Sequence, residues 1–181
     1  MWEASPTPMR CESMLRHPLV RGRSFELRKG RISEAYACYA ITKVVNLRRR
    51  VLANDASAPV LLDSWQYLRS RGRLKLFAFC IMPDHFHLVF CLMPAENLSK
   101  LMEDTGKFTA RELNKLLGTK GQLWQEGFQD HRCRNEEELH DLCLYIEHNP
   151  VRANLVAAAE LWPYSSAFAG NKGMLDRDWW P

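Results

Sequence analysis

Residues 76–93 read LFAFCIMPDHFHLVFCLM, two apolar runs that meet at a tight Pro83-Asp84 turn. Apolar runs on both sides of such a turn are typical of two paired, buried strands. Side chains at i and i+2 of a strand leave the same face about 7 Å apart, so His85 and His87 share one face. Two imidazoles on one face can converge on a cation, although two solvated or hydrogen-bonded histidines beside a turn would give the same pattern.

Working outward from this hairpin, hydrophobic periodicity and helix-end signals divide the rest of the chain into elements. We predict strands at about 35–47, 74–82 and 85–93, an extended segment at 124–134, and helices at about 57–71, 96–117 and 136–148. The order strand, helix, strand, strand, helix, strand predicts an α+β, ferredoxin-like split βαβ fold. In that fold an antiparallel sheet carries helices on one face, which leaves the opposite face for a ligand. The last helix is additional to it.

Length and composition favour a single globular domain. The chain has 181 residues, of which 46% are hydrophobic and 25% charged, and no apolar run approaches the ~18 residues of a membrane span. We expect a basic N-terminal arm at 1–34, a core domain at 35–169 and a C-terminal tail at 170–181. The N-terminal residues lack the pattern of an export signal, and the six cysteines form no C-x-x-C pair. A cytoplasmic protein with reduced thiols is the expectation.

Positive charge is concentrated near the N-terminus, although the formal net charge is only +4. Arginines and lysines recur through residues 10–31, and Arg48, Arg49 and Arg50 follow soon after. This distribution suits a polyanionic partner, and an ordinary solvated tail would show it equally well.

The last predicted helix carries a second candidate pair. A buried stripe at helical spacing is expected from Leu139, Leu142, Cys143 and Ile146. Tyr145 and Asn149, four residues apart, lie together beside that stripe, so a phenol and an amide oxygen face the same space. A tyrosine at a core boundary and an asparagine before Pro150 at a helix end are also common structural features.

Taken together, the motifs resemble one family. In chain order they are His85-Phe86-His87, Trp124-Gln125-x-Gly127-Phe128-x-Asp130-His131, Tyr145-Ile146-x-x-Asn149-Pro150-Val151-Arg152-Ala153 and Trp162-Pro163-Tyr164-Ser165-Ser166. Over about residues 35–169 the chain resembles the REP-associated tyrosine transposases, which belong with the single-tyrosine HUH transposases. The resemblance implies an endonuclease in which His85 and His87 hold Mg²⁺ or Mn²⁺, Asn149 is the third ligand and Tyr145 is the nucleophile.

The expected chemistry follows from these residue types. A divalent cation on a non-bridging phosphate oxygen neutralises developing charge and orients the phosphorus for in-line attack. A phenol is a weak nucleophile at neutral pH and needs a nearby cation or base. Attack by Tyr145 would leave a 5′-phosphotyrosine and a free 3′-hydroxyl, which stores the bond for later strand joining.

The resemblance also implies the partner, single-stranded DNA folded into a hairpin, such as a repetitive extragenic palindrome. Related transposases work as dimers or as monomers, so both a monomer and a homodimer stay open. Candidate DNA-binding residues are Arg28, Lys29 and Arg31 in the arm and the helical stripe Lys100, Lys107, Arg111 and Lys115, which a merely solvated helix face would also present. Two alternatives stay open: a hairpin-binding protein without catalysis, and a metal phosphoesterase that uses water as nucleophile.

Overall fold

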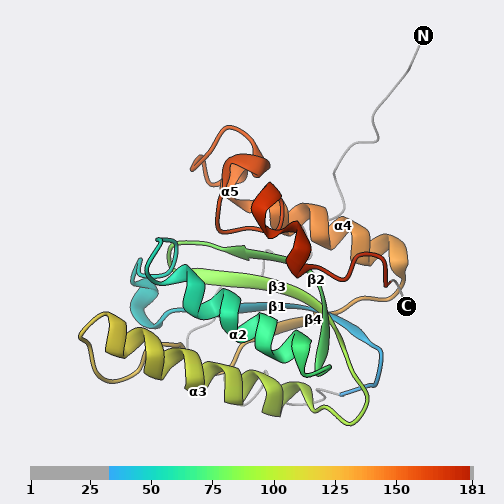
Figure 1. Ribbon diagram of the computed structural model, residues 1–181, viewed down its shortest axis with the longest axis horizontal. Coiled ribbons are helices and arrows are strands. Elements are labelled where there is room, and N and C mark those ends of the chain that lie inside the picture. Colours follow the sequence, from blue (N-terminus) through green and yellow to red (C-terminus); the bar gives the residue numbers. More distant parts are fainter. Residues whose placement is uncertain (1–32, 180–181) are drawn as a thin grey trace.

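The computed structural model describes residues 33–179, which form four strands and several helices (Figure 1). The strands are β1 (Cys38–Val44), β2 (Leu74–Ile81), β3 (His85–Leu92) and β4 (Gln129–Arg132). The α-helices are α2 (Ala58–Ser70), α3 (Leu98–Leu116), α4 (Glu136–Glu147) and α5 (Asn149–Arg152), and the 3-10 helices are η2 (Asn46–Arg48), η3 (Ala159–Leu161) and η4 (Ala169–Met174).

The sheet has the order β2-β3-β1-β4, and every neighbouring pair is antiparallel. The hairpin between β2 and β3 closes over Pro83 and Asp84, where the Met82 N–H donates to the His85 carbonyl at 2.8 Å. Strand order and direction are those of the split βαβ arrangement. The predicted α+β, ferredoxin-like fold is confirmed.

Helices α2 and α3 cover one face of the sheet, as predicted (Figure 1). Local sequence explains both: α2 has proline in its first turn, and the Asn97 side chain caps α3 by accepting from the Lys100 N–H at 2.9 Å. Between these helices and the sheet lies the larger core cluster, in which Trp65 of α2 is fully buried against Phe79 and Phe86. Strand β3 supplies this core with every second side chain.

The opposite face of the sheet is not open, which corrects the expectation that it is left for a ligand. Helix α4 lies across it (Figure 1). The buried stripe of α4 packs on side chains of β1, β2 and β3 in a second core cluster, which includes Leu142, Ile146, Phe77 and Val89. An amphipathic stripe must be buried somewhere, and the open sheet face is where α4 buries it. His85 and His87 lie on this same face, at the start of β3.

The segment expected to be a C-terminal tail from residue 170 is packed against β2 as far as residue 179. Just before this segment the Ser166 N–H donates to the Phe79 carbonyl at 2.9 Å, and within it the Asp176 N–H donates to the Leu76 carbonyl at 2.7 Å. Asp176 also accepts from Arg69 of α2 at 2.8 Å. These bonds satisfy the exposed edge of β2, which would otherwise present unpaired backbone groups.

The arm predicted at residues 1–34 lies outside the described residues except for Ser33 and Glu34. Across residues 33–179, no helix has both the length and the apolar character needed to cross a membrane.

Candidate active site

The two histidines of β3 stand on the sheet face that α4 covers. Their ring centroids are 4.8 Å apart and the rings are nearly perpendicular. His87 is buried, whereas His85 at the start of the strand is partly exposed. The pairing register puts His87 opposite Thr42 of β1 and opposite Cys80 of β2.

Each imidazole is held through its Nδ1 atom. His85 Nδ1 lies 2.6 Å from Asp84 Oδ1, and His87 Nδ1 lies 2.8 Å from Thr42 Oγ1. A carboxylate can only accept, so Asp84 selects the His85 tautomer that leaves the Nε2 lone pair available, and the Thr42 hydroxyl can accept from His87 in the same way. Partners on the outer nitrogen are what metal-binding histidines ordinarily have.

Burial, and then the charge around the pair, favour the neutral imidazole of His87. Burial, together with the nearby His85 and Arg152, lowers the pKa of His87 to about 3. Burial alone would raise the pKa of Asp84, but hydrogen bonds from His85 and Arg48 hold it below its usual value. A neutral, preoriented imidazole is the form that coordinates a cation.

Tyr145 and Asn149 come from the end of α4 and the start of α5. Helix α4 begins at the cap Asn135, whose side chain accepts from the Glu138 N–H at 2.8 Å. It ends at Glu147, and Asn149-Pro150 opens the short helix α5 directly afterwards. Proline fits the first turn of a helix, so the chain stays helical and both side chains stay on the predicted stripe, each partly buried.

Arg152 connects the predicted site residues to one another. Its Cζ lies 3.6 Å from the centroid of the Tyr145 ring, its Nη2 donates to Asn149 Oδ1 at 2.6 Å, and its charge contributes to lowering the pKa of His87. Arg152 is part of the motif at residues 145–153, but the sequence alone assigns it no role in the site. Its spacing of seven from Tyr145 and three from Asn149, on one helical stripe, was the signal that could have identified it.

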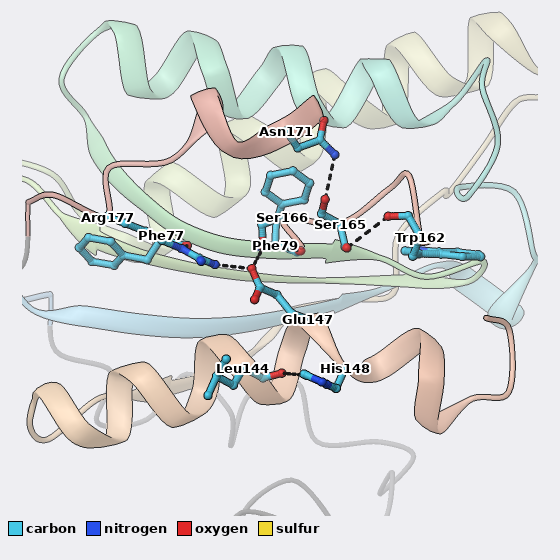
Figure 2. Close-up of polar contacts among 10 residues, drawn as sticks. All are labelled: Phe77, Phe79, Leu144, Glu147, His148, Trp162, Ser165, Ser166, Asn171 and Arg177. Atoms are coloured by element: carbon cyan, nitrogen blue, oxygen red, sulfur yellow. Dashed lines mark hydrogen bonds and ion pairs between the residues drawn. The ribbon is translucent and has the colours of Figure 1, made fainter. Parts of the chain in front are cut away.

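A buried carboxylate between Tyr145 and Asn149 fastens α4 to the edge of the sheet (Figure 2). Glu147 is 6% exposed, and its Oε1 accepts from Ser166 Oγ at 2.7 Å and pairs with Arg177. Ser166 in turn accepts from the Phe79 N–H at 3.0 Å, and Arg177 donates to the Phe77 carbonyl at 3.2 Å. The C-terminal segment thus fixes the helix that carries Tyr145 to strand β2.

The side chains of His85, His87 and Asn149 suit a divalent cation that keeps some coordination positions for water or phosphate. Within residues 33–179, no group of three His, Cys, Asp or Glu side chains is placed to hold a metal ion. A site on His85 and His87 therefore needs the Asn149 amide oxygen, water or phosphate to complete it. Two imidazoles with oxygen ligands fit Mn²⁺ well and Mg²⁺ less well. Asn149 Oδ1 already accepts from the Arg152 N–H, which would compete with a metal for this oxygen.

The predicted DNA-binding stripe lies on α3, in the layer across the sheet from α4 (Figure 1). All four side chains are exposed. Lys100 pairs with Asp104 at 2.8 Å, Lys107 with Glu103 at 2.5 Å and Arg111 with Glu112 at 2.8 Å. The structure therefore does not bring this stripe to the histidines, and its DNA-binding role stays a prediction. Arg28, Lys29 and Arg31 lie outside the described residues.

His131, which was left out of the predicted ligand set, is engaged elsewhere. Its Nε2 lies 3.0 Å from Glu138 Oε1, and the other oxygen of Glu138 accepts from the Arg134 N–H at 2.6 Å. The pair joins β4 to the first turn of α4. It is a structural contact at the end of the helix remote from Tyr145.

Comparison with known proteins supports the resemblance to REP-associated tyrosine transposases. A REP-associated tyrosine transposase of Escherichia coli strain K12 is 28% identical over 145 residues, which cover 75% of this chain and 81% of that protein. A Haemophilus influenzae protein that carries the same name provisionally is 28% identical over 102 residues, 49% of this chain and 56% of its own length. The chain thus spans little more than half of the Haemophilus relative.

A solved structure of a REP-associated tyrosine transposase bound to a REP hairpin superposes with a TM-score of 0.62 at 22% identity, covering 83% of this chain and 89% of that one. This likeness shows a shared fold. The family model described as transposase IS200-like matches residues 35–149, a range that begins before β1 and ends on Asn149. Since that match covers well over half of the sequence, the chain belongs to the IS200-like transposase family.

Proposed function

We propose that this protein is a metal-dependent single-stranded DNA transesterase that nicks and rejoins hairpin-forming DNA through a 5′-phosphotyrosine. The observation that carries the proposal is the position of Arg152. Its guanidinium stacks on Tyr145 and donates to Asn149, and its charge acts on His87. One side chain thus interacts with the candidate nucleophile, the candidate oxygen ligand and one of the two histidines.

The proposed site assigns a task to each side chain. His85, His87 and Asn149 would hold Mg²⁺ or Mn²⁺, which when bound supplies positive charge to a non-bridging oxygen of the scissile phosphate. Asp84 and Thr42 bond the two Nδ1 atoms, which leaves both Nε2 atoms as the atoms that would bind the metal. Arg152 has five N–H donors, and those that Asn149 does not engage can reach a phosphate oxygen beside the Tyr145 ring.

The proposed transesterification exchanges one phosphoester bond for another and consumes no water. Tyr145 Oη bonds to phosphorus and loses its proton, while the bond from phosphorus to the 3′-oxygen breaks and that oxygen takes up a proton. The products are a 5′-phosphotyrosine and a free 3′-hydroxyl. Attack of a 3′-hydroxyl on the phosphotyrosine reverses the exchange and joins strands, so energy of the original bond is retained.

The substrate class rests on the relatives. They are named as REP-associated transposases, and the structural neighbour was solved with a REP hairpin. We therefore propose hairpin-forming single-stranded DNA, of the kind formed by repetitive extragenic palindromes, as the substrate of this chain.

The deciding experiment is adduct formation on a denaturing gel. A library of labelled DNA hairpins with single-stranded flanks is incubated with Mn²⁺ or Mg²⁺ and the wild type, Tyr145→Phe or His85→Ala. We expect a covalent protein-DNA species with the wild type only, and its loss on chelation of the metal. The absence of any adduct with the wild type across the library contradicts the proposal.

The same gels distinguish the two alternatives. Cleavage that persists in Tyr145→Phe, with a free 5′-phosphate, would show a phosphoesterase that uses water. Tight hairpin binding without cleavage in either metal would show a binding protein without catalysis. Both outcomes remove the phosphotyrosine step, and only the first keeps the metal site.

A further inference from the structure

The loop that follows β1 presents an apolar side chain at the edge of the candidate site. Leu47 is 81% exposed, the most exposed of the large hydrophobic residues described. Leu47 and the next residue, Arg48, both have left-handed backbone conformations, with φ of 58° and 50°. Arg49 and Arg50 follow, so an apolar tip is succeeded directly by three arginines.

This conformation is fixed by hydrogen bonds on both sides. Toward the histidine hairpin, the Val45 N–H donates to the Asp84 carbonyl at 2.8 Å and the Leu52 N–H donates to the Pro83 carbonyl at 3.0 Å. On the other side, the Asn46 N–H donates to the Leu123 carbonyl at 2.7 Å, and Arg49 donates to the Gln122 carbonyl at 3.2 Å. The exposed Leu47 is thus held in place by its neighbours.

Two successive residues with positive φ are the pattern of a type I′ turn, which favours glycine, asparagine and aspartate, whereas a leucine in this conformation is strained. A side chain this exposed contributes almost nothing to the core. Folding alone therefore gives no reason for an apolar residue here, where glycine or asparagine would fit with less strain.

Charged contacts through Asp84 also connect the loop to the histidines. Arg48 Nη1 donates to Asp84 Oδ2 at 3.0 Å, and the other oxygen of Asp84 lies 2.6 Å from His85. The loop thus contacts the histidine hairpin, and a strand whose phosphate lay at the histidine pair could extend over it. The arginines complement the phosphates of such a strand, and unpaired bases offer apolar faces to a side chain such as Leu47.

We propose that residues 46–50 bind the single-stranded flank of the DNA next to the scissile phosphate, with Leu47 packed on an unpaired base and Arg50 on a phosphate. The inference rests on the proposed function, because it names how that site holds its strand. Arg50 is exposed and stands beside two further arginines, which favours a polyanion. The contact of the loop with Asp84, which binds His85, favours the strand that enters the site.

The test measures binding in EDTA, so that no cleavage is needed. Two fluorescein-labelled DNA probes are compared, a hairpin with a flank of about ten randomised nucleotides and the same hairpin without a flank. We expect Leu47→Asn and Leu47→Gly to weaken binding of the flanked hairpin about tenfold and to leave the blunt hairpin unchanged. Tyr67→Gln removes a side chain that is 62% exposed, at the far end of α2, and serves as the matched control.

Stability separates a binding role from a structural one. Asparagine and glycine adopt positive φ more readily than leucine, so both variants should keep or raise the Tm of the protein. Affinity that falls while Tm holds supports the inference. A lower Tm, or equal loss of affinity for both probes, would show that Leu47 supports the fold and would overturn it.

Salt dependence tests the arginine. Loss of one phosphate contact lowers the slope of log Kd against log salt concentration by about 0.7 for a single strand. Arg50→Gln should show that decrease on the flanked hairpin, and Arg71→Gln, an exposed arginine just past α2, should not. An unchanged slope for Arg50→Gln overturns the assignment of the phosphate contact.

The inference and the proposed function can fail separately. A wild type that prefers the flanked hairpin through Leu47 but forms no adduct with Mn²⁺ removes the transesterase activity and leaves the binding loop. A wild type that forms the adduct but binds as tightly after Leu47→Asn retains the activity and removes the loop. A wild type that binds neither probe overturns the inference.

Discussion

The guanidinium of Arg152 lies over the ring of Tyr145, with 3.6 Å between Cζ and the ring centroid, and its Nη2 donates to Asn149 Oδ1 at 2.6 Å. The residues are seven apart in sequence, so two helical turns bring them together. A cation in this position orients the phenol ring and occupies the amide oxygen that the proposed metal needs. Arg152 is thus placed to exchange one partner for another as substrate and metal enter.

Replacement of Arg152 by glutamine should slow adduct formation without weakening metal binding. The rate of adduct formation on a labelled hairpin should fall about tenfold or more, because a charged donor to the phosphate is lost. Affinity for Mn²⁺ without DNA, measured by the free Mn²⁺ signal in electron paramagnetic resonance, should hold or rise, because Asn149 Oδ1 is released. Arg152→Lys should retain part of the rate. A parallel fall in both quantities would indicate that Arg152 only supports helix α5.

The buried Glu147 should contribute strongly to stability, because its charge is compensated only by Ser166 and Arg177 among the described residues. Removal of one partner leaves a buried polar group without compensation. We expect Glu147→Ala to lower the free energy of unfolding by about 2–4 kcal/mol and Arg177→Met, whose side chain is 42% exposed, by about 1–3 kcal/mol. Urea denaturation of the full chain measures both.

A double variant completes the comparison for Glu147. Glu147→Ala with Arg177→Met should cost less than the sum of the single changes, because each single change strands the other partner. Lys107→Met breaks the exposed pair with Glu103 and should alter stability by no more than about 0.5 kcal/mol. Additive effects at Glu147 and Arg177 would mean that their ion pair does not fasten α4.

The sequence carried most of the fold because its signals are local. The alternation around His85 and His87 fixed one strand and its two faces, and caps and periodicity placed the long helices to within a residue or two. The side of the sheet that α4 covers was not readable, since a hydrophobic stripe says that a helix is buried but not against which face.

The burial of charged residues was the second feature that the sequence predicted poorly. Glu147 lies four residues after Cys143 and so continues the predicted buried stripe. The partners that compensate its charge, Ser166 and Arg177, lie 19 and 30 positions later in the chain. Both partners lie in a region of short 3-10 turns without periodicity, so its sequence does not show what it packs against, and only Arg177 falls in the segment predicted as a tail. Lys43 did carry a signal, because it occupies a core-facing position of β1 between Ile41 and Val45.

The stability of the protein should depend on pH through Lys43. Its Nζ donates to the Gly127 carbonyl at 2.7 Å and to the Gln125 carbonyl at 3.2 Å, while burial lowers the pKa of Lys43 from 10.5 to about 8. Folding therefore releases a proton between these two values, so stability rises with pH across that window. The gain is complete above 10.5 and is lost as the pH falls through 8.

Comparison with Lys43→Met isolates this effect from other groups that titrate at high pH. The free energy of unfolding of the wild type should increase relative to that of Lys43→Met by about 1–3 kcal/mol between pH 7.5 and 10.5. Denaturation curves at several pH values give the difference. A constant difference would show that the two carbonyls keep the ammonium charged throughout.

The hydroxyl of Thr42 should set the affinity of the histidine pair for metal, because it holds His87 through Nδ1 at 2.8 Å. Thr42→Val keeps the shape and the strand propensity but removes the oxygen, and loss of such a partner typically weakens metal binding by about 10- to 100-fold. Thr42→Ser should keep the affinity of the wild type. Titration of the full chain with Mn²⁺ at neutral pH, in the absence of DNA, measures it.

Thr105→Val provides the matched control for Thr42→Val, since Thr105 is buried in α3 and its hydroxyl donates to the Leu101 carbonyl at 2.7 Å. That change should alter stability and leave Mn²⁺ affinity as it is. If Thr42→Val bound Mn²⁺ as tightly as the wild type, the orientation of His87 would not depend on β1. The metal would then have to be held mainly by His85 and by oxygens from α5, water and phosphate.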